Sequence, residues 1–201
     1  MDLTAVAVTF GTIFLVELPD KTFIAALVLS TRYRPVAVWI GVGLAFAVQT
    51  LLAVLAGKVA TLLPEAVFSS IAIAIFLAGA FVLFRTAPGA ESEERQQEEE
   101  YAARATEPKP FLKAVVASFV VLFAAEWGDL SQLLTINLVA RFDDPVSVFV
   151  GAWGALLAVS GLAVLVGRTL LRHMRLAVLH YVGATVCLVL AGVTTYELLA
   201  A

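Results

Sequence analysis

The chain has 201 residues, of which 61% are hydrophobic and only 14% are charged. A soluble domain does not carry that share of apolar side chains, so the composition indicates a protein of the lipid bilayer and excludes a large catalytic domain outside the membrane. The formal net charge of −3 argues against a nucleic-acid partner, which calls for a basic face.

Long apolar runs predict an all-α polytopic membrane protein, because each crossing of a bilayer needs about 20 apolar residues. The first run is not expected to be a signal peptide, since it lacks a basic start and carries Glu17, Asp20 and Lys21 inside it. Six membrane-spanning helices are predicted, at residues 3–31, 35–57, 66–85, 111–140, 146–167 and 176–198.

A polar, glutamate-rich segment separates the third and fourth runs. We interpret it as a solvated tether with a short helix, in preference to a mouth that attracts cations. The predicted organisation is a first three-helix unit at 1–86, an acidic linker at 87–110 and a second three-helix unit at 111–201.

The two three-helix units resemble each other. In their first spans the matched positions are 109 residues apart, so Glu17 corresponds to Glu126 and Asp20 to Asp129. In their second spans the offset is 110 residues, and the third spans match weakly. An odd number of spans in each copy reverses the second copy in the membrane, so the repeat is predicted to be inverted.

Basic residues outside the spans predict the orientation. With six spans, only Lys58 and Arg141 fall on one side of the membrane. Basic segments stay in the cytoplasm, so we expect a cytoplasmic linker, both termini outside and, for a bacterial protein, the plasma (inner) membrane. The basic residues on the linker side are Arg32, Arg34, Arg85, Arg95, Arg104, Lys109, Lys113, Arg168, Arg172 and Arg175.

Four carboxylates lie near the middle of the first and fourth spans. Each costs about 2.5 to 3.5 kcal/mol to insert, so a purely structural bundle would be more stable without them. A spacing of i and i+3 places the acids of each span on one helix face, and an inverted repeat lets the two faces meet near the midplane. The four acids are Glu17, Asp20, Glu126 and Asp129.

Converging carboxylates must hold a cation or protons, because repulsion and desolvation oppose full ionisation. The ligands available are oxygens, which suit Mn²⁺, Ca²⁺ and Mg²⁺ better than Zn²⁺ or copper. Protons that compete for the same oxygens would make an alternately exposed site an exchanger, without any cofactor. Nitrogen and sulfur ligands lie far along the chain from the acids and do not repeat: His173, Met174, His180 and Cys187.

Other polar residues near the acids have two interpretations. Lys21 is either an intrahelical ion-pair partner of Glu17 or a coupling residue, and Leu130 takes its place in the second copy. For Thr22 and Ser131 we favour a hydroxyl bonded to the carbonyl four residues back. The remaining polar residues either line an ion path or join helices, and they are Gln49, Thr50, Gln132, Asn137 and Ser160.

Small and helix-breaking residues carry predictions about packing. Gly41 and Gly151 are each followed by an alanine four residues later, a spacing that lets helix backbones touch. Pro19 is expected to kink the first span. Gly128, at the matching position, is expected to permit close helix approach.

The two acidic motifs, residues 17–22 and 126–131, resemble the paired Glu-x-Gly-Asp-Lys/Arg-Thr/Ser motifs of the GDT1 family, and the resemblance extends over nearly the whole chain. It implies a secondary transporter that moves Mn²⁺ or Ca²⁺ against protons, and among bacterial relatives Mn²⁺ export. By position it assigns the four acids as ligands, supported by Thr22 and Ser131. This chain departs from the motifs at Pro19 and Leu130.

Two other classes of protein are compatible with buried acids. An intramembrane metal-dependent enzyme could use paired carboxylates to activate water, but the chain has no nucleophile or histidine set to accompany them. A non-transporting membrane assembly factor would gain nothing from acids at the midplane. We therefore predict a transporter and not an enzyme, with no prediction of its oligomeric state.

Overall fold

A computed structural model describes residues 1–18, 21–104, 109–173 and 176–200, and within these ranges it contains helices and no strand. This confirms the all-α prediction. The elements, in chain order, are α1 (Leu3–Glu17), α2 (Lys21–Arg32), α3 (Pro35–Ala60), α4 (Glu65–Thr86), the short 3-10 helix η1 (Ala87–Gly89), α5 (Ala90–Arg104), α6 (Phe111–Ala125), α7 (Leu130–Phe142), α8 (Pro145–His173) and α9 (Leu176–Ala200).

Two of the predicted spans are interrupted at the acidic motifs. The span expected at 111–140 consists of α6 and α7, which are bent by 76° relative to each other. The span expected at 3–31 consists of α1 and α2, because α1 ends at Glu17. For the second motif, the prediction that both acids lie on one face of a continuous helix is therefore wrong, because Glu126 caps the end of α6 and Asp129 caps the start of α7.

Gly128 allows the chain to turn between α6 and α7. Its φ is +80°, a conformation that costs most other residues about 1 to 2 kcal/mol. A Cβ at this position would have no neighbouring atom within 4 Å. The expectation that Gly128 permits close helix approach is therefore wrong, and its role is the left-handed backbone conformation.

Equivalent glycines bring helices of the two halves together. A Cβ on Gly41 in α3 would lie 2.3 Å from the carbonyl oxygen of Val115 in α6. A Cβ on Gly151 in α8 would lie 2.6 Å from the carbonyl oxygen of Val6 in α1. Val6 and Val115 are themselves 109 residues apart, so the two contacts occur at matched positions, and the predicted packing role of both glycines is confirmed.

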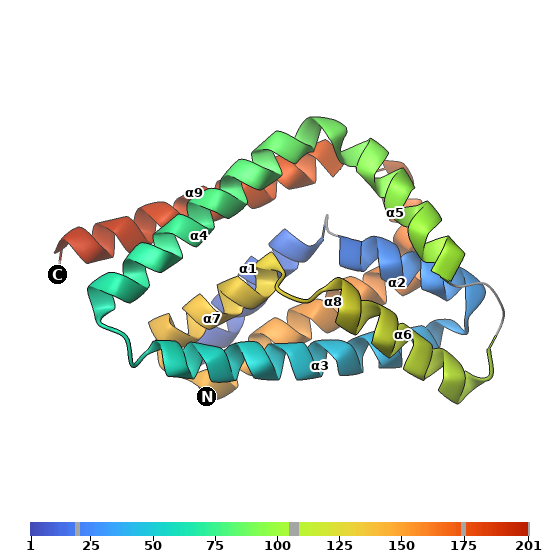
Figure 1. The fold of residues 1–201 in the computed structure, drawn as a ribbon, viewed down its shortest axis with the longest axis horizontal. Coiled ribbons are helices and arrows are strands. Elements are labelled where there is room, and N and C mark those ends of the chain that lie inside the picture. Colours follow the sequence, from blue (N-terminus) through green and yellow to red (C-terminus); the bar gives the residue numbers. More distant parts are fainter. Residues whose placement is uncertain (19–20, 105–108, 174–175, 201) are drawn as a thin grey trace.

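The helices α4 and α9 lie side by side as a pair, to one side of α1, α3 and α7 (Figure 1). The centroids of the Phe84 and Tyr181 rings are 5.4 Å apart, near the end of α4 that leads into α5. The N-terminus and the C-terminal end of α9 lie toward one end of the long axis, and α5 lies toward the other (Figure 1).

The acidic linker contains the expected short helix, α5, which packs against α2. Tyr101 is only 5% exposed and belongs to the main apolar core. The interpretation of the linker as a solvated tether is therefore incomplete, because one face of α5 is part of the folded body.

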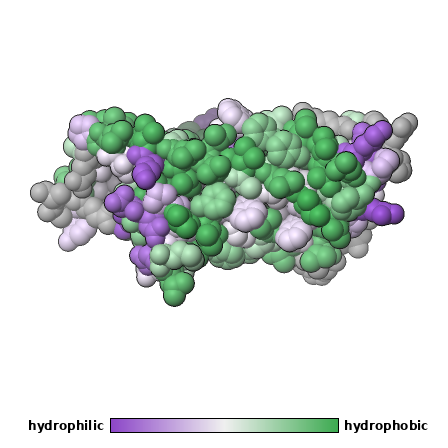
Figure 2. Space-filling view, turned by 90° about the horizontal axis from the view of Figure 1, so that it is seen from below, coloured by the Kyte–Doolittle hydropathy of each residue, from purple (hydrophilic) through white to green (hydrophobic). Residues whose placement is uncertain are grey.

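Three helical segments are long and apolar enough to cross a membrane: Pro35–Ala60, Ala66–Gly89 and Pro145–Leu165. The bent pair α6 and α7 makes a fourth if it is one span. These counts refer to the described ranges, where α1, α2 and His180–Tyr196 are shorter apolar helices. Figure 2 shows a broad hydrophobic face with hydrophilic residues at its two ends, as an integral membrane protein requires.

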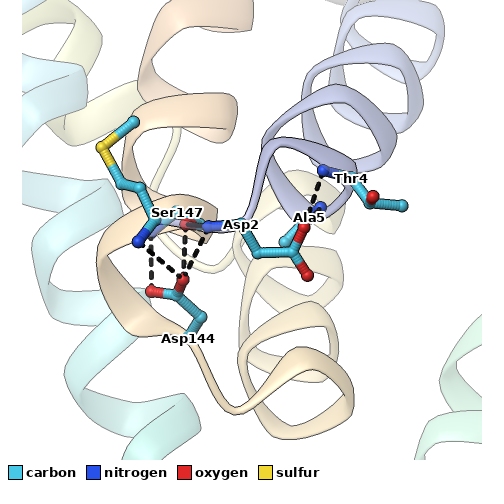
Figure 3. A network of polar contacts seen from close by, with 6 residues as sticks. Asp2, Thr4, Ala5, Asp144 and Ser147 are labelled. Carbon is cyan, nitrogen blue, oxygen red and sulfur yellow. Dashed lines mark hydrogen bonds and ion pairs between the residues drawn. The ribbon is translucent and has the colours of Figure 1, made fainter.

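A polar network joins the start of the chain to the start of α8 (Figure 3). The Ser147 hydroxyl donates to Asp144 Oδ2 at 2.6 Å, and the Asp2 backbone N–H donates to the same oxygen at 3.1 Å. The hydrogen bonds from Ser147, first its hydroxyl and then its backbone N–H, lower the pKa of Asp144 from 3.8 to about 2. The ionised carboxylate thus holds the N-terminal segment against α8.

Candidate cation site

Glu126 is buried where α6 ends. Its side chain is 2% exposed, and its backbone N–H completes the last turn by donating to the Leu122 carbonyl at 3.0 Å. Because the helix stops here, the Glu126 carbonyl has no acceptor role inside α6, and the Gln132 side-chain amide donates to it instead at 2.5 Å.

Gln132 spans the break between α6 and α7. Besides donating to the Glu126 carbonyl, it accepts a hydrogen bond from the Gly128 backbone N–H at its Oε1, at 3.2 Å. A single side chain in the first turn of α7 thus satisfies two backbone groups that a broken helix leaves open. The predicted supporting residue Gln132 therefore acts, first of all, as a brace for the non-helical backbone.

Asp129 caps α7. Its Oδ2 accepts from the Ser131 backbone N–H and from the Ser131 hydroxyl, both at 3.3 Å. A carboxylate in this position satisfies an orphan N–H and interacts favourably with the helix dipole. The expectation that the Ser131 hydroxyl bonds to a carbonyl four residues back is wrong, since its partner is the motif acid.

A small cavity of about 10 Å³ adjoins Glu126, which is room for roughly one water-sized particle. Gln49 reaches it from α3 while its amide donates to the Phe123 carbonyl at 3.1 Å. Thr135 reaches it from α7 while its hydroxyl donates to the Ser131 carbonyl at 2.7 Å. The lining consists of Phe46, Gln49, Thr50, Glu126, Ser131, Gln132, Thr135 and Leu156.

This cavity gathers several of the predicted residues. Glu126, Ser131, Gln132 and Gln49 lie together on its wall. Thr135 was not singled out from the sequence, although its position four residues after Ser131 puts it on the same face of α7. A carboxylate surrounded by hydroxyl and amide groups suits a hard cation, whose preferred ligands are oxygens.

The first motif lies at the corresponding break. Glu17, the last residue of α1, is 1% exposed, and Thr22 at the start of α2 is fully buried. The Thr22 hydroxyl makes no hydrogen bond to any described residue, so the expected bond to a carbonyl four residues back is absent here as well. Asp20 and the side chain of Lys21 lie outside the described residues.

The convergence of all four acids therefore stays a prediction. Within the described ranges, which omit Asp20, no group of three or more His, Cys, Asp and Glu side chains is placed to hold a metal ion. Asn137 is buried further along α7. The Ser160 hydroxyl donates to the Leu156 carbonyl at 2.8 Å, a bond within its own helix.

Asp129 also borders a larger cavity, of about 400 Å³, between α7 and the α4/α9 pair. His180 of α9 lines the same cavity. The sequence did not suggest this neighbour, because His180 is 51 residues beyond Asp129 and has no counterpart in the first copy. Only the packing of α9 brings it near the motif.

Comparison with known proteins identifies the class to which this fold and these motifs belong. The family described as "Divalent cation/proton antiporter GDT1" matches residues 5–91 and 114–201. The chain therefore belongs to the GDT1 family, which is a family of cation transporters and not of enzymes. The two matched ranges include both acidic motifs and leave out most of the linker.

Several named proteins are similar to the chain. "Protein PAM71, chloroplastic" of Arabidopsis thaliana is 29% identical over 96% of this chain and 56% of its own length. "GDT1-like protein sll0615" of Synechocystis is 36% identical over 69% of this chain and 71% of its own. The "Putative manganese exporter" of Vibrio cholerae is 28% identical over 96% of this chain and 92% of its own.

The chain spans little more than half the length of the two PAM71 proteins of Arabidopsis thaliana, 56% of one and 58% of the other. No match to a solved structure was found.

Proposed function

We propose that this chain exports a divalent cation, Mn²⁺ in preference to Ca²⁺, in exchange for protons through a carboxylate site inside the membrane. The observation that carries the proposal is the pair of buried glutamates, Glu17 and Glu126, each at the matched end of a broken helix. Buried acids at broken helices are typical of coupling-ion sites in transporters. Mn²⁺ is favoured because the Vibrio cholerae relative is named for manganese.

The proposed architecture is six spans in two inverted three-helix repeats, with α1 plus α2 and α6 plus α7 each counted as one broken span. The matched contacts of Gly41 and Gly151 support it. The proposed units are 1–86 and 111–201, joined by the linker at 87–110. Both termini are proposed to face outward and the linker the cytoplasm, in line with the basic residues on the linker side.

The cation is proposed to sit beside Glu126, within reach of Gln49 and Thr135, and to be shared with Glu17, Asp20 and Asp129 in the course of transport. Protons compete for the same carboxylate oxygens, so a carboxylate that takes up a proton releases the metal. Broken helices suit this exchange, because their free backbone carbonyls add oxygen ligands without adding charge.

The test is transport by the purified protein in lipid vesicles with an imposed pH gradient. We expect Mn²⁺ flux accompanied by proton movement in the opposite direction, and loss of both in Glu17→Gln and Glu126→Gln. Glu99→Gln, in the exposed part of α5, is the matched control and should transport normally. Protein that folds but moves no Mn²⁺ or Ca²⁺ would contradict the proposal and favour a membrane assembly factor.

A further inference from the structure

An open hollow of about 560 Å³ runs along the outside of α6, and we call it the α6 hollow. Its described lining residues are spaced three and four apart, so they share one face of the helix. Val115 and Ser118 are buried on another face, where α6 packs against Gly41 of α3. Apart from two lysines, the lining consists of Leu112, Val116, Ala117, Val120 and Val121.

The two lysines, Lys109 and Lys113, lie at the end of the hollow nearest to the linker. Lys113 is in the first turn of α6, and Lys109 precedes the helix, with its Nζ 5.9 Å from the centroid of the Tyr33 ring. Among the described residues, neither lysine forms an ion pair with a carboxylate. Two positive charges that line one small hollow repel each other, so this end favours an anion.

The rest of the α6 hollow is apolar and about as long as one leaflet of a bilayer is thick. From Leu112 to Val121 the helix rises by nine residues of about 1.5 Å each, roughly 14 Å in all, and half of the hydrocarbon core of a bilayer is about 15 Å. Leu112 is 72% exposed and Val120 is 56% exposed, so this surface is open to a molecule beside α6. A free anion would fill only the basic end, whereas a phospholipid matches both parts.

The first half of the chain has no matching basic end. At the offset of 109 residues Lys113 corresponds to Thr4, and the segment before α1 carries Asp2. The internal repeat therefore does not account for the lysines. In the proposed orientation the α6 hollow faces the cytoplasmic leaflet, whose anionic lipids attract basic segments.

We propose that the α6 hollow binds an anionic phospholipid. The headgroup phosphate binds between Lys109 and Lys113, and one acyl chain lies along Leu112, Val116 and Val120. The basic end selects for the negative charge, and the apolar stripe requires the chain. This lipid site is separate from the candidate cation site, and it does not depend on transport.

Native mass spectrometry of the purified protein, released from micelles with added phosphatidylglycerol, measures the affinity for the first lipid bound. We expect this affinity to fall about 5-fold in Lys113→Gln and about 30-fold in Lys109→Gln/Lys113→Gln, because each lysine near an anionic lipid contributes about a factor of five. Arg95→Gln, which removes a positive charge from an exposed position in α5, should bind the lipid like the wild type.

Two further ligands separate the headgroup from the chain. Phosphatidylglycerol with short, water-soluble chains should bind to the wild type at least about 10-fold more weakly, because fewer CH₂ groups are buried on the apolar stripe. Inorganic phosphate should not displace the long-chain lipid. Phosphatidylcholine, whose headgroup has no net charge, should bind equally to the wild type and to all three variants, which also shows that the variants are folded.

Equal affinity for phosphatidylglycerol in the wild type and in Lys109→Gln/Lys113→Gln would overturn the lipid site, because the lipid would then bind elsewhere. A loss in Arg95→Gln as large as that in Lys113→Gln would overturn it too, since any positive charge on the linker side would serve. Displacement by inorganic phosphate would reveal a site for a free anion in place of a lipid. Vesicles that move no Mn²⁺ would contradict the proposed function and leave this test unaffected.

Discussion

The breaks after Glu17 and after Glu126 occupy matched positions, but their surroundings differ. At the second break, polar side chains from α3 and α7 surround a small cavity. At the first, the corresponding region is an apolar cluster that includes α2 and α8 residues. Three matched positions make the difference: Gln132 corresponds to Phe23, Thr135 to Ala26, and Gln49 to Val159.

The comparison separates the arrangement of the helices, which we call the frame, from the chemistry of the cation site. The frame is alike in the two halves, since each has a broken helix, a buried glutamate and a glycine contact at the same positions. Among the described residues, the cavity with amide side chains lies at the second break, while two of its hydroxyl positions, Ser131 and Thr50, keep a buried hydroxyl in the other half, at Thr22 and Ser160. We therefore propose that the second break holds the cargo, and that the first contributes its acids to coupling from a less polar setting.

The largest expected effect is a difference between the two glutamates in how much each contributes to Mn²⁺ binding. Glu126→Gln should weaken Mn²⁺ binding by about 100-fold or more, because it removes the carboxylate of the polar cavity. Glu17→Gln should abolish exchange while it weakens binding by less than about 10-fold. Isothermal titration of the purified variants with Mn²⁺ checks the prediction, and equal losses of binding in the two variants would contradict it.

The glycine contacts provide a test in which the two halves should behave alike. Gly41→Ala and Gly151→Ala each place a Cβ against a backbone oxygen, at 2.3 Å and 2.6 Å, and should each lower the free energy of unfolding by about 1 to 3 kcal/mol. Gly11→Ala is the control, because a Cβ there meets nothing within 4 Å. Unfolding in mixed micelles measures all three, and a loss in Gly41→Ala alone would break the equivalence of the frames.

Replacing a polar residue of the small cavity by its apolar counterpart from the first half tests directly whether that polar group binds the cation. Thr135→Ala, which copies Ala26 of the first half, should weaken Mn²⁺ binding about 10-fold because the cavity loses a hydroxyl. Thr194→Ala is the matched control, since the Thr194 hydroxyl also donates to the carbonyl four residues back, at 2.9 Å in α9. Equal affinity in the two variants, measured by Mn²⁺ titration, would remove Thr135 from the site.

The smallest expected effect concerns the hydrogen-bond network of Asp144, Ser147 and the N-terminal segment. In the first half the position that matches Asp144 is occupied by Arg34, which cannot make these bonds. The folded pKa of Asp144 is about 2, below its ordinary value of 3.8, so the ionised carboxylate stabilises the fold above pH 4 and this contribution disappears as the pH falls toward 2. Thermal unfolding between pH 2 and 7 should show that Asp144→Asn is less stable than wild type at neutral pH.

At the acid end of that range the two melting temperatures should approach each other. A difference between wild type and Asp144→Asn that stays constant from pH 7 to pH 2 would show that the Asp144 charge does not contribute to the stability of the network. Asp2, whose Oδ1 caps α1 by accepting from the Thr4 backbone N–H at 2.8 Å, is unchanged in both proteins.

Much of the fold could be predicted because it follows from local pattern. The apolar runs predict the helices, and the small residues Gly41 and Gly151 predict the close contacts between them. The breaks could not be predicted from periodicity, since Glu126 and Asp129 at i and i+3 suit one face of an unbroken helix equally well. What stabilises the break is a nearby side chain, because the Gln132 amide replaces the missing backbone partners.

Duplication revealed the acids of the site, and polar character inside apolar spans revealed Gln49 and Gln132. Glu17 and Glu126 repeat, so they stood out from the sequence. Thr135 and His180 do not repeat. Thr135 lies one turn after Ser131 on α7, whereas the proximity of His180 to Asp129 depends on how α9 packs. Internal symmetry alone does not find residues such as Thr135 and His180, which lack a counterpart of the same type in the first half.

The most direct measurement is the position of bound Mn²⁺ by anomalous X-ray diffraction from crystals grown with the ion. The account predicts one internal peak in the cavity at the α6–α7 break, at coordination distance, about 2.2 Å, from a Glu126 oxygen. An internal peak bound to Glu17 without Glu126, or peaks on the protein surface alone at saturating Mn²⁺, would contradict it.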